Sequence, residues 1–175
     1  MTEPDIYLSI IIPSYNEAEK LPKTLARIQE YLAGKPFSYE IIVACDGPRD
    51  NTIEIAKKIA GEMKNLRVID RRQNRGKGYT VREGMLAAKG KIRLFIDADN
   101  GTDIGHFDLM RPFFDKGYDI VISSRDWKDV KGAKQAVAQS FIKRLAGNMG
   151  NLYIQLLAVP GIWDTQNGFK AFRDY

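Results

Sequence analysis

Ile92-Arg93-Leu94-Phe95-Ile96-Asp97-Ala98-Asp99 is the stretch from which both the fold and the site can be inferred. Its short apolar run is typical of a buried strand. Burial does not account for Asp97 and Asp99, because ionised carboxylates are almost never left unpaired inside a protein. We therefore expect the strand to carry both carboxylates to an edge of its sheet. A divalent metal with a phosphate behind it is one candidate partner there, and a Lys or Arg side chain is the other.

Strands and helices alternate along the chain around this stretch. Short apolar runs predict further strands at 8–12, 39–44, 66–69 and 119–125. Helical spacing predicts helices after the first, second and third strands and at 106–114, with Asn16 as the N-cap of the first helix and Asp50 or Asn51 as the N-cap of the second. A long amphipathic helix is predicted from about Gln135 to Pro160. The alternation predicts an α/β fold with a mostly parallel sheet flanked by helices.

Polar and charged residues follow four of these predicted strands. Ligands bind beyond the carboxyl ends of the strands in such sheets, so these residues are expected at one edge. The four groups are Pro13-Ser14-Tyr15-Asn16-Glu17, Asp46-Gly47, Asp97-Ala98-Asp99 and Ser124-Arg125. Their convergence is stronger evidence for a site than any single motif.

Bulk composition narrows the class without deciding it. The chain has 175 residues, a net charge of +5 and a pI of about 9.2, which fits an anionic partner or a solvated surface with excess Lys. The N-terminal residues Met1 to Asp5 do not resemble a secretory signal, and no run approaches a membrane span. A single cysteine, Cys45, excludes an intrachain disulfide.

Other phosphate-handling motifs fit less well. Gly76-Lys77-Gly78 lacks the spacing of a P-loop, and no G-x-G-x-x-G follows the first strand. The D-x-D-x-[TV] motif of haloacid dehalogenase phosphatases needs a Thr or Val two residues after its second Asp. Here Thr102 lies three residues after Asp99. A D-x-D phosphatase therefore stays open only as an alternative.

The motifs, taken in order, resemble those of family 2 glycosyltransferases of the GT-A fold. They are the Ser9–Glu17 segment, Asp46-Gly47, Arg75-Gly76-Lys77-Gly78, Asp97-Ala98-Asp99 and Ser124-Arg125. The segment Asp164-Thr165-Gln166-Asn167-Gly168-Phe169-Lys170 is similar to the D-T-Q-C-G-F-K signature of dolichyl-phosphate β-glucosyltransferases, and polyprenyl-phosphate mannosyltransferases are close relatives. Two departures are that Asn167 replaces the Cys and that Cys45-Asp46 replaces a pair of acidic residues.

The resemblance implies roles for individual residues on the donor side. Glu17 would lie near the ribose hydroxyls, Asp46 would accept a hydrogen bond from the base, and Asp99 would bind Mg²⁺ or Mn²⁺ with Asp97 beside the ribose or sugar as a second metal ligand. The nucleotide-binding set is Pro13, Ser14, Tyr15, Glu17, Asp46, Arg75, Lys77 and Asp97.

The resemblance also implies an acceptor side. The catalytic set would be Asp97, Asp99, Arg125 and Asp164. The phosphate of the acceptor would be held by Arg125, Lys143, Arg144 and Gln166.

The activity implied is inverting transfer of a hexose, glucose preferred and mannose possible, to a polyprenyl or dolichyl phosphate. The donor would be UDP-glucose or GDP-mannose. We expect residues 1–175 to form one GT-A catalytic domain, shortened at its C-terminus, with peripheral contact at the cytoplasmic face of a membrane and no nucleic-acid partner. The alternative to an enzyme is a catalytically dead module that binds a nucleotide sugar or a nucleic acid.

Overall fold

The computed structural model describes residues 5–124, 157 and 160–174. The chain forms two compact units, one of residues 1–121 and 168–175 and the other of residues 122–167, and each is described by itself. Arg125, Lys143 and Arg144, which are predicted site residues, lie outside the described residues. The predicted helix at 135–160 also falls almost entirely outside them.

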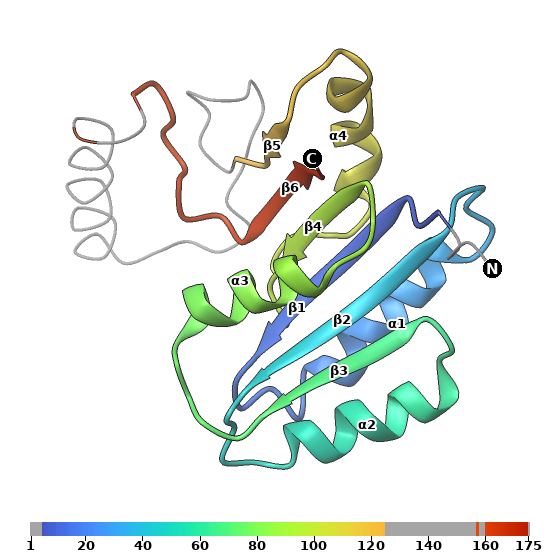
Figure 1. The fold of residues 1–175 in the computed structure, drawn as a ribbon, viewed down its shortest axis with the longest axis vertical. Helices are drawn as coiled ribbons and strands as arrows, with labels where there is room; N and C mark the ends of the chain where they lie inside the picture. The colour runs from blue at the N-terminus through green and yellow to red at the C-terminus, as the bar shows by residue number, and fades with distance from the viewer. Residues whose placement is uncertain (1–4, 125–156, 158–159, 175) are drawn as a thin grey trace. The chain divides into compact units, whose positions relative to one another are not determined.

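Strands and helices alternate within the described residues, as the sequence predicts (Figure 1). In chain order the elements are β1 (Leu8–Ser14), α1 (Leu21–Leu32), β2 (Tyr39–Asp46), α2 (Thr52–Glu62), β3 (Leu66–Arg71), α3 (Lys77–Ala87), β4 (Ile92–Ile96), α4 (His106–Asp115), β5 (Ile120–Ile122) and β6 (Phe169–Arg173).

The strands form one mostly parallel sheet in the order β3-β2-β1-β4-β6-β5. β1 pairs in parallel with β2 and β4, and β2 pairs in parallel with β3. β6 is antiparallel to β4, with Ile96 opposite Phe169. The sequence analysis does not predict β6, because two of its five residues are cations and the strand is stabilised by pairing with β4 rather than by its own composition.

Both faces of the sheet are covered by helices, which explains the unbroken apolar runs of β1 and β2. Leu8, Ile10 and Ile12 of β1 belong to a core formed with α1, α2 and α4. Ile11 faces the opposite side and packs with residues of β2 and α3. Figure 1 shows α3 in front of the sheet and α1 behind it. Gly84 of α3 permits this contact, because a Cβ there would lie 2.5 Å from Ile11 Cγ2.

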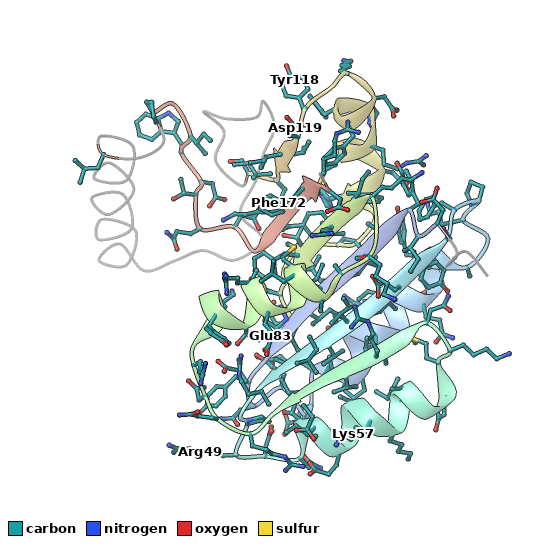
Figure 2. All side chains as sticks on the ribbon, viewed as in Figure 1. Arg49, Lys57, Glu83, Tyr118, Asp119 and Phe172 are labelled. Atoms are coloured by element: carbon teal, nitrogen blue, oxygen red, sulfur yellow. The ribbon has the colours of Figure 1, made fainter. Side chains whose placement is uncertain are left out.

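The predicted N-cap of the first helix is wrong. Asn16 has a φ of 55° and its Oδ1 accepts a hydrogen bond from the Arg49 amide at 2.7 Å, while α1 begins later, at Leu21. Asn16 therefore joins the loop after β1 to the loop after β2, where Figure 2 shows Arg49. Of the two residues predicted to cap the second helix, Asn51 holds the N-cap position of α2 but makes no side-chain cap hydrogen bond. Asp50, one residue earlier, accepts a hydrogen bond from the Thr52 amide at Oδ1 at 3.0 Å.

Candidate functional site

A cavity of about 360 Å³ opens at the carboxyl ends of β1, β2 and β4. Its lining contains every predicted nucleotide-site residue except Arg75. The lining residues are Pro13, Ser14, Tyr15, Glu17, Asp46, Asn74, Gly76, Lys77, Thr80, Asp97, Ala98 and Asp99. The predicted convergence is thus observed for three of the four groups of strand-end residues, while Ser124 does not line the cavity and Arg125 lies outside the described residues. Asn74, Gly76 and Thr80 add a further side from the loop after β3 and from α3.

Asp97 and Asp99 lie just beyond the end of β4 and differ in their surroundings. Asp97 is partly exposed, and its Oδ1 is 2.6 Å from Lys77 Nζ at the first residue of α3. Asp99 is exposed, and its Oδ1 accepts a hydrogen bond from the Gly101 amide at 3.0 Å. Lys77 is 60% exposed, so its ammonium can leave Asp97 for a phosphate without a burial cost.

Gly168 has a steric role that the sequence analysis did not identify. The antiparallel pairing of β6 with β4 brings residue 168 beside Asp97, and a Cβ at this position would overlap the Asp97 carboxylate. The glycine of the D-T-Q-N-G-F-K segment therefore leaves room for one of the two acids. The D-T-Q-N-G-F-K segment contains this glycine, but the reason why a glycine is needed depends on the pairing of β6, which was not predicted.

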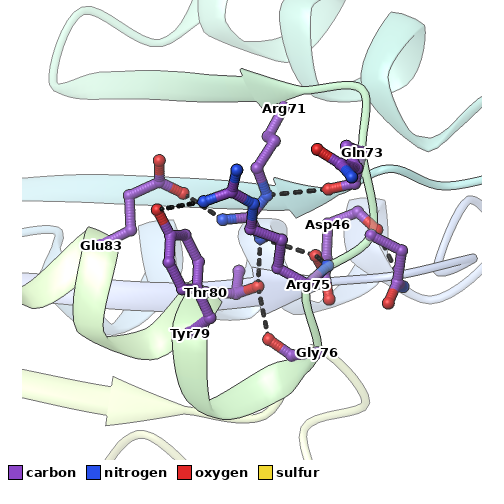
Figure 3. A network of polar contacts seen from close by, with 9 residues as sticks. Asp46, Arg71, Gln73, Arg75, Gly76, Tyr79, Thr80 and Glu83 are labelled. Carbon is purple, nitrogen blue, oxygen red and sulfur yellow. Dashed lines mark hydrogen bonds and ion pairs between the residues drawn. The ribbon is translucent and has the colours of Figure 1, made fainter.

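Asp46 is a buried carboxylate at the end of β2, only 3% exposed. Its Oδ1 accepts hydrogen bonds from the Arg75 amide at 2.8 Å and from Arg71 Nη2 at 2.6 Å (Figure 3). Burial alone would raise the pKa of Asp46, but these hydrogen bonds outweigh it and hold the pKa below its ordinary value. Asp46 is therefore ionised at neutral pH, and it lines the cavity.

The backbone around Asp46 is closely fitted. Gly47 has a φ of 59°, and a Cβ there would lie 2.6 Å from the Asn74 amide nitrogen. Asn74 Nδ2 donates to the Asp46 carbonyl oxygen at 3.0 Å. Only glycine suits position 47, because the loop after β3 crosses it at this distance.

Arg71 is the principal residue that reasoning from the sequence missed, because the strand predicted at 66–69 ends before it. In the structure it is the last residue of β3 and lies opposite Asp46 in the parallel register. Its side chain is 12% exposed and contacts four polar groups, which Figure 3 shows. The available signal was that Arg71 is a cation just after the strand predicted at 66–69, and that the preceding strand ends in an acid, Asp46.

The Arg75 side chain does not line the cavity. Its Nη1 donates to Tyr79 Oη at 3.0 Å, and its guanidinium lies 4.9 Å from the centre of the Tyr79 ring. The Arg75 residue reaches Asp46 through its backbone amide instead. The role of the Arg75 side chain in nucleotide binding stays a prediction.

The loop after β1 supplies the remaining lining. Ser14 is buried, Tyr15 is exposed, and Glu17 Oε2 lies 3.2 Å from Lys20 Nζ. The Glu17 amide donates to Thr52 Oγ1 at 2.9 Å, which fixes this loop to the start of α2. The wall of the cavity thus depends on contacts between two loops that follow neighbouring strands.

The D-T-Q-N residues belong to the unit of residues 122–167. Within it Asp164 is buried, Gln166 is exposed, and Asn167 Nδ2 donates to Ser123 Oγ at 2.7 Å. Asn167, which stands where the resembling signature has Cys, therefore joins the two ends of this unit.

The arrangement can bind a hard cation together with phosphate. No group of three or more His, Cys, Asp and Glu among the described residues is arranged to hold a metal ion. Mg²⁺ and Mn²⁺ are commonly held by one or two carboxylates and by substrate phosphates, so the pair Asp97 and Asp99 fits this requirement.

No helix in the described part of the chain is long and apolar enough to cross a membrane.

Solved structures identify the class of fold. Mannosyl-3-phosphoglycerate synthase from Rubrobacter xylanophilus superposes with a TM-score of 0.69 at 19% identity, covering 96% of this chain and 54% of that one. Glucosyl-3-phosphoglycerate synthase from Mycobacterium tuberculosis, in complex with uridine diphosphate, gives 0.67 at 21% identity, covering 96% and 57%. These similarities confirm the predicted GT-A fold and, at these identities, nothing further.

The chain belongs to glycosyl transferase family 2, which it matches over residues 9–174. A dolichyl-phosphate beta-glucosyltransferase of Drosophila melanogaster is 38% identical over 97% of this chain and 55% of its own length. Proteins of the same name from Dictyostelium discoideum and Trichomonas vaginalis are 35% and 34% identical over 96% and 97% of this chain. The chain spans about half the length of these curated relatives, 54% in both of the last two cases.

Proposed function

We propose that this chain catalyses inverting transfer of a hexose from a nucleotide-diphosphate sugar to a polyprenyl or dolichyl phosphate, as one GT-A catalytic domain. The observation that carries the proposal is the cavity at the sheet edge, which unites Asp46, Lys77, Asp97 and Asp99. The names of the relatives support glucose as the sugar and dolichyl phosphate as the acceptor. UDP-glucose is the preferred donor, and GDP-mannose is the second candidate.

The residues of the cavity divide between the parts of the donor. Asp46, the deepest acid, would accept a hydrogen bond from the base, and Glu17 would lie near the ribose hydroxyls. Lys77 would exchange its ion pair with Asp97 for one with the donor phosphates, since its ammonium is already exposed. This exchange would leave the Asp97 carboxylate beside the ribose or sugar.

A divalent ion, Mg²⁺ or Mn²⁺, would be held by Asp99 with help from Asp97. When bound, it supplies positive charge that neutralises the nucleoside diphosphate as it leaves. Gly168 contributes by leaving the space that the Asp97 carboxylate occupies.

A strong general base is not required on the acceptor side. A lipid phosphate is already anionic at neutral pH, so its oxygen can attack the anomeric carbon directly once it is positioned. Arg125, Lys143, Arg144 and Gln166 remain the proposed residues for binding this phosphate. Asp164 is proposed as a base only for the case of a hydroxyl acceptor. Contact with the cytoplasmic face of a membrane is part of the same proposal.

The test begins with thermal unfolding in the presence of UDP, GDP and their sugars, each with Mg²⁺ or Mn²⁺. A ligand at a hundredfold excess over its Kd stabilises the native state by about 2.7 kcal/mol, so the correct donor will stand out. Sugar transfer to dolichyl phosphate is then measured with that donor. Absence of stabilisation by every nucleotide would reject the proposal, and release of phosphate from simple phosphomonoesters would favour the D-x-D phosphatase instead.

A further inference from the structure

A buried hydroxyl outside the lining of the cavity contacts the backbone between the two acids. Thr24, in the first turn of α1, is 2% exposed, and its Oγ1 donates to the carbonyl oxygen of Ala98 at 2.7 Å. We propose that Thr24 is a positioning residue that orients Asp97 and Asp99 and thereby sets the affinity of the site for a divalent cation. The inference rests on the proposed function, in which these acids hold Mg²⁺ or Mn²⁺, and it adds the residue that orients them.

The sheet itself does not extend as far as the acids. Within the described residues, β4 pairs with β1 up to Phe95 and with β6 up to Ile96. The two acids and Ala98 follow beyond both pairings. Ala98 is buried, and a buried carbonyl group without a donor is costly, so it needs a partner from another element. Thr24 supplies this partner from α1.

The Thr24 hydroxyl has a local alternative that it does not use. A Ser or Thr within a helix often donates to the carbonyl oxygen four residues earlier, which here belongs to Lys20. That oxygen accepts from the Thr24 amide at 3.1 Å. A hydroxyl has a single hydrogen, so its bond to Ala98, 74 positions along the chain, excludes the local one. The contact therefore joins α1 to the acid turn and is not a by-product of helix formation.

The helix gives this hydroxyl a rigid base. Leu21, Leu25 and Ile28 of α1 are fully buried and belong to the same core cluster as Ala98. Core packing therefore sets the position of Thr24. The peptide unit from Ala98 to the next residue is planar, so fixing the Ala98 carbonyl also fixes the direction in which the chain enters the second acid.

The turn that carries the acids has its own short-range bonds. Asn100 has a φ of 54°, and its amide donates to the Asp97 carbonyl oxygen at 3.3 Å. The Gly101 amide donates to Asp99 Oδ1 at 3.0 Å. These bonds give the turn its shape, but both begin and end within it. The bond from Thr24 connects this shape to the core, so we expect both acids to lose their common orientation without it.

The experiment compares three variants. Thr24→Val keeps the shape of the side chain and removes its donor, Thr24→Ser keeps the donor, and Ser9→Ala is the matched control. Ser9 is also buried, and its Oγ donates to Glu40 Oε1 at 2.6 Å, away from the lining of the site cavity. UDP binding is measured by calorimetry with Mn²⁺ and again in EDTA. The ratio of the two affinities is the Mn²⁺ enhancement.

We expect the Mn²⁺ enhancement to be at least roughly tenfold in the unmodified chain, Thr24→Ser and Ser9→Ala. In Thr24→Val it should fall to about threefold or less, because misplaced acids hold the ion poorly. The affinity for UDP in EDTA should not change in any variant. Equal losses of the enhancement in Thr24→Val and Ser9→Ala would mean that lost stability is responsible, and would overturn the inference.

A second readout needs neither nucleotide nor metal. The Gly101 amide bonds the Asp99 carboxylate, so its resonance in a nuclear magnetic resonance spectrum reports how that carboxylate lies. This resonance should move in Thr24→Val and return in Thr24→Ser. A resonance that does not move in Thr24→Val would show that the turn is independent of Thr24, and would overturn the inference.

Two further outcomes separate this inference from the proposed function. If the unmodified chain binds no nucleotide, the proposed function fails, and the Gly101 resonance still decides whether Thr24 orients the turn. If it binds UDP equally with and without Mn²⁺, the inference fails while a nucleotide-sugar function stands. Should Thr24→Val not fold, Thr24→Cys leaves a weaker donor in place, and a Mn²⁺ enhancement equal to that of Thr24→Ser would overturn the inference.

Discussion

The two ends of the β2–β3 pair carry the same chemical pair, an acid on β2 and an arginine on β3. At the amino end, Glu40 Oε2 accepts from Arg67 Nε at 3.0 Å. At the carboxyl end, Asp46 Oδ1 accepts from Arg71 Nη2 at 2.6 Å. Both acids are buried, and both have pKa values below the ordinary value. Burial, charge and a shifted pKa therefore do not distinguish the site from the scaffold.

The difference lies in the other acids that share each cavity. Glu40 uses both oxygens, because Oε1 accepts from Ser9 Oγ and from the Lys89 amide, each at 2.6 Å, and Oε2 accepts from Arg67. Asp46 Oδ1 accepts from Arg71 Nη2 and from the Arg75 amide, and a hydrogen bond with the Thr80 side chain also lowers the pKa of Asp46. A hollow of about 650 Å³ at Glu40 is larger than the 360 Å³ cavity at Asp46. The size of the cavity therefore does not mark the functional end. The cavity at Asp46 also contains Asp97 and Asp99, whereas Glu40 is the one acid among the residues that line the other hollow.

Among the variants that test this comparison of the two ends, we expect the largest effect on activity at Asp99. Asp99→Asn removes a charge from the exposed pair at the carboxyl end, so we expect sugar transfer to fall about 10²–10³-fold, with thermal stability unchanged. The measurement is kcat with dolichyl phosphate as acceptor, beside a melting curve. Asp103→Asn is the control, because Asp103 lies in the same loop and its Oδ1 only accepts from the Gly105 amide at 2.7 Å. Equal losses in the two variants would contradict the assignment.

Two glycines test the contrast next. Gly168→Ala places a methyl group against the Asp97 carboxylate, and we expect kcat/KM to fall roughly 10–100-fold, because the acid is displaced by an ångström or so. Gly90→Ala places one 2.6 Å from the Ser9 amide nitrogen at the other end of the sheet, which should cost about 1–3 kcal/mol of stability. The activity of the folded fraction should survive only in Gly90→Ala, and the opposite pattern would refute the division between the two ends.

The two acids themselves give the third test. Glu40→Gln removes the charge of a buried, hydrogen-bonded acid and should lower the free energy of unfolding by about 2 kcal/mol, reduced from the cost of a fully buried pair because Arg67 is half-exposed. Its affinity for UDP should not change. Asp46→Asn should weaken UDP about tenfold. Denaturant unfolding and calorimetry on both variants provide the comparison, and a loss of UDP binding in Glu40→Gln would break it.

The sequence predicted those features that depend on local pattern. Apolar runs located β1 to β4, and the polar residues after them located the cavity, because parallel strands must end at one edge. It did not predict β6 or the roles of Gly168 and Arg71, which depend on the pairing of distant strands. Asn16 is a residue type that commonly caps helices, but its side chain accepts a hydrogen bond from Arg49 in another loop. Which of these contacts forms depends on how the two loops fold together. Local periodicity thus predicts the strands and the edge at which the cavity lies. The contacts of Gly168 and Arg71 depend on strand register instead.

The smallest expected effect concerns pH and the closed end of the sheet. Burial would raise the pKa of Glu40, but hydrogen bonds from Ser9, Lys89 and Arg67 hold it below its ordinary 4.5. A carboxyl whose folded pKa is lowered adds stability at neutral pH, and this contribution disappears as pH falls below about 4.5 and through the folded pKa. The stability gap between the unmodified chain and Glu40→Gln should therefore narrow as pH falls below about 4.5.

Equilibrium unfolding at a series of pH values measures this gap. Glu62→Gln, which removes an exposed acid at the end of α2, should show no comparable narrowing and controls for the loss of one charge. The UDP affinity of Glu40→Gln should follow that of the unmodified chain across the series, because Glu40 lies outside the lining of the site cavity. A gap that stays constant on acidification would show that Glu40 contributes through its shape rather than its charge.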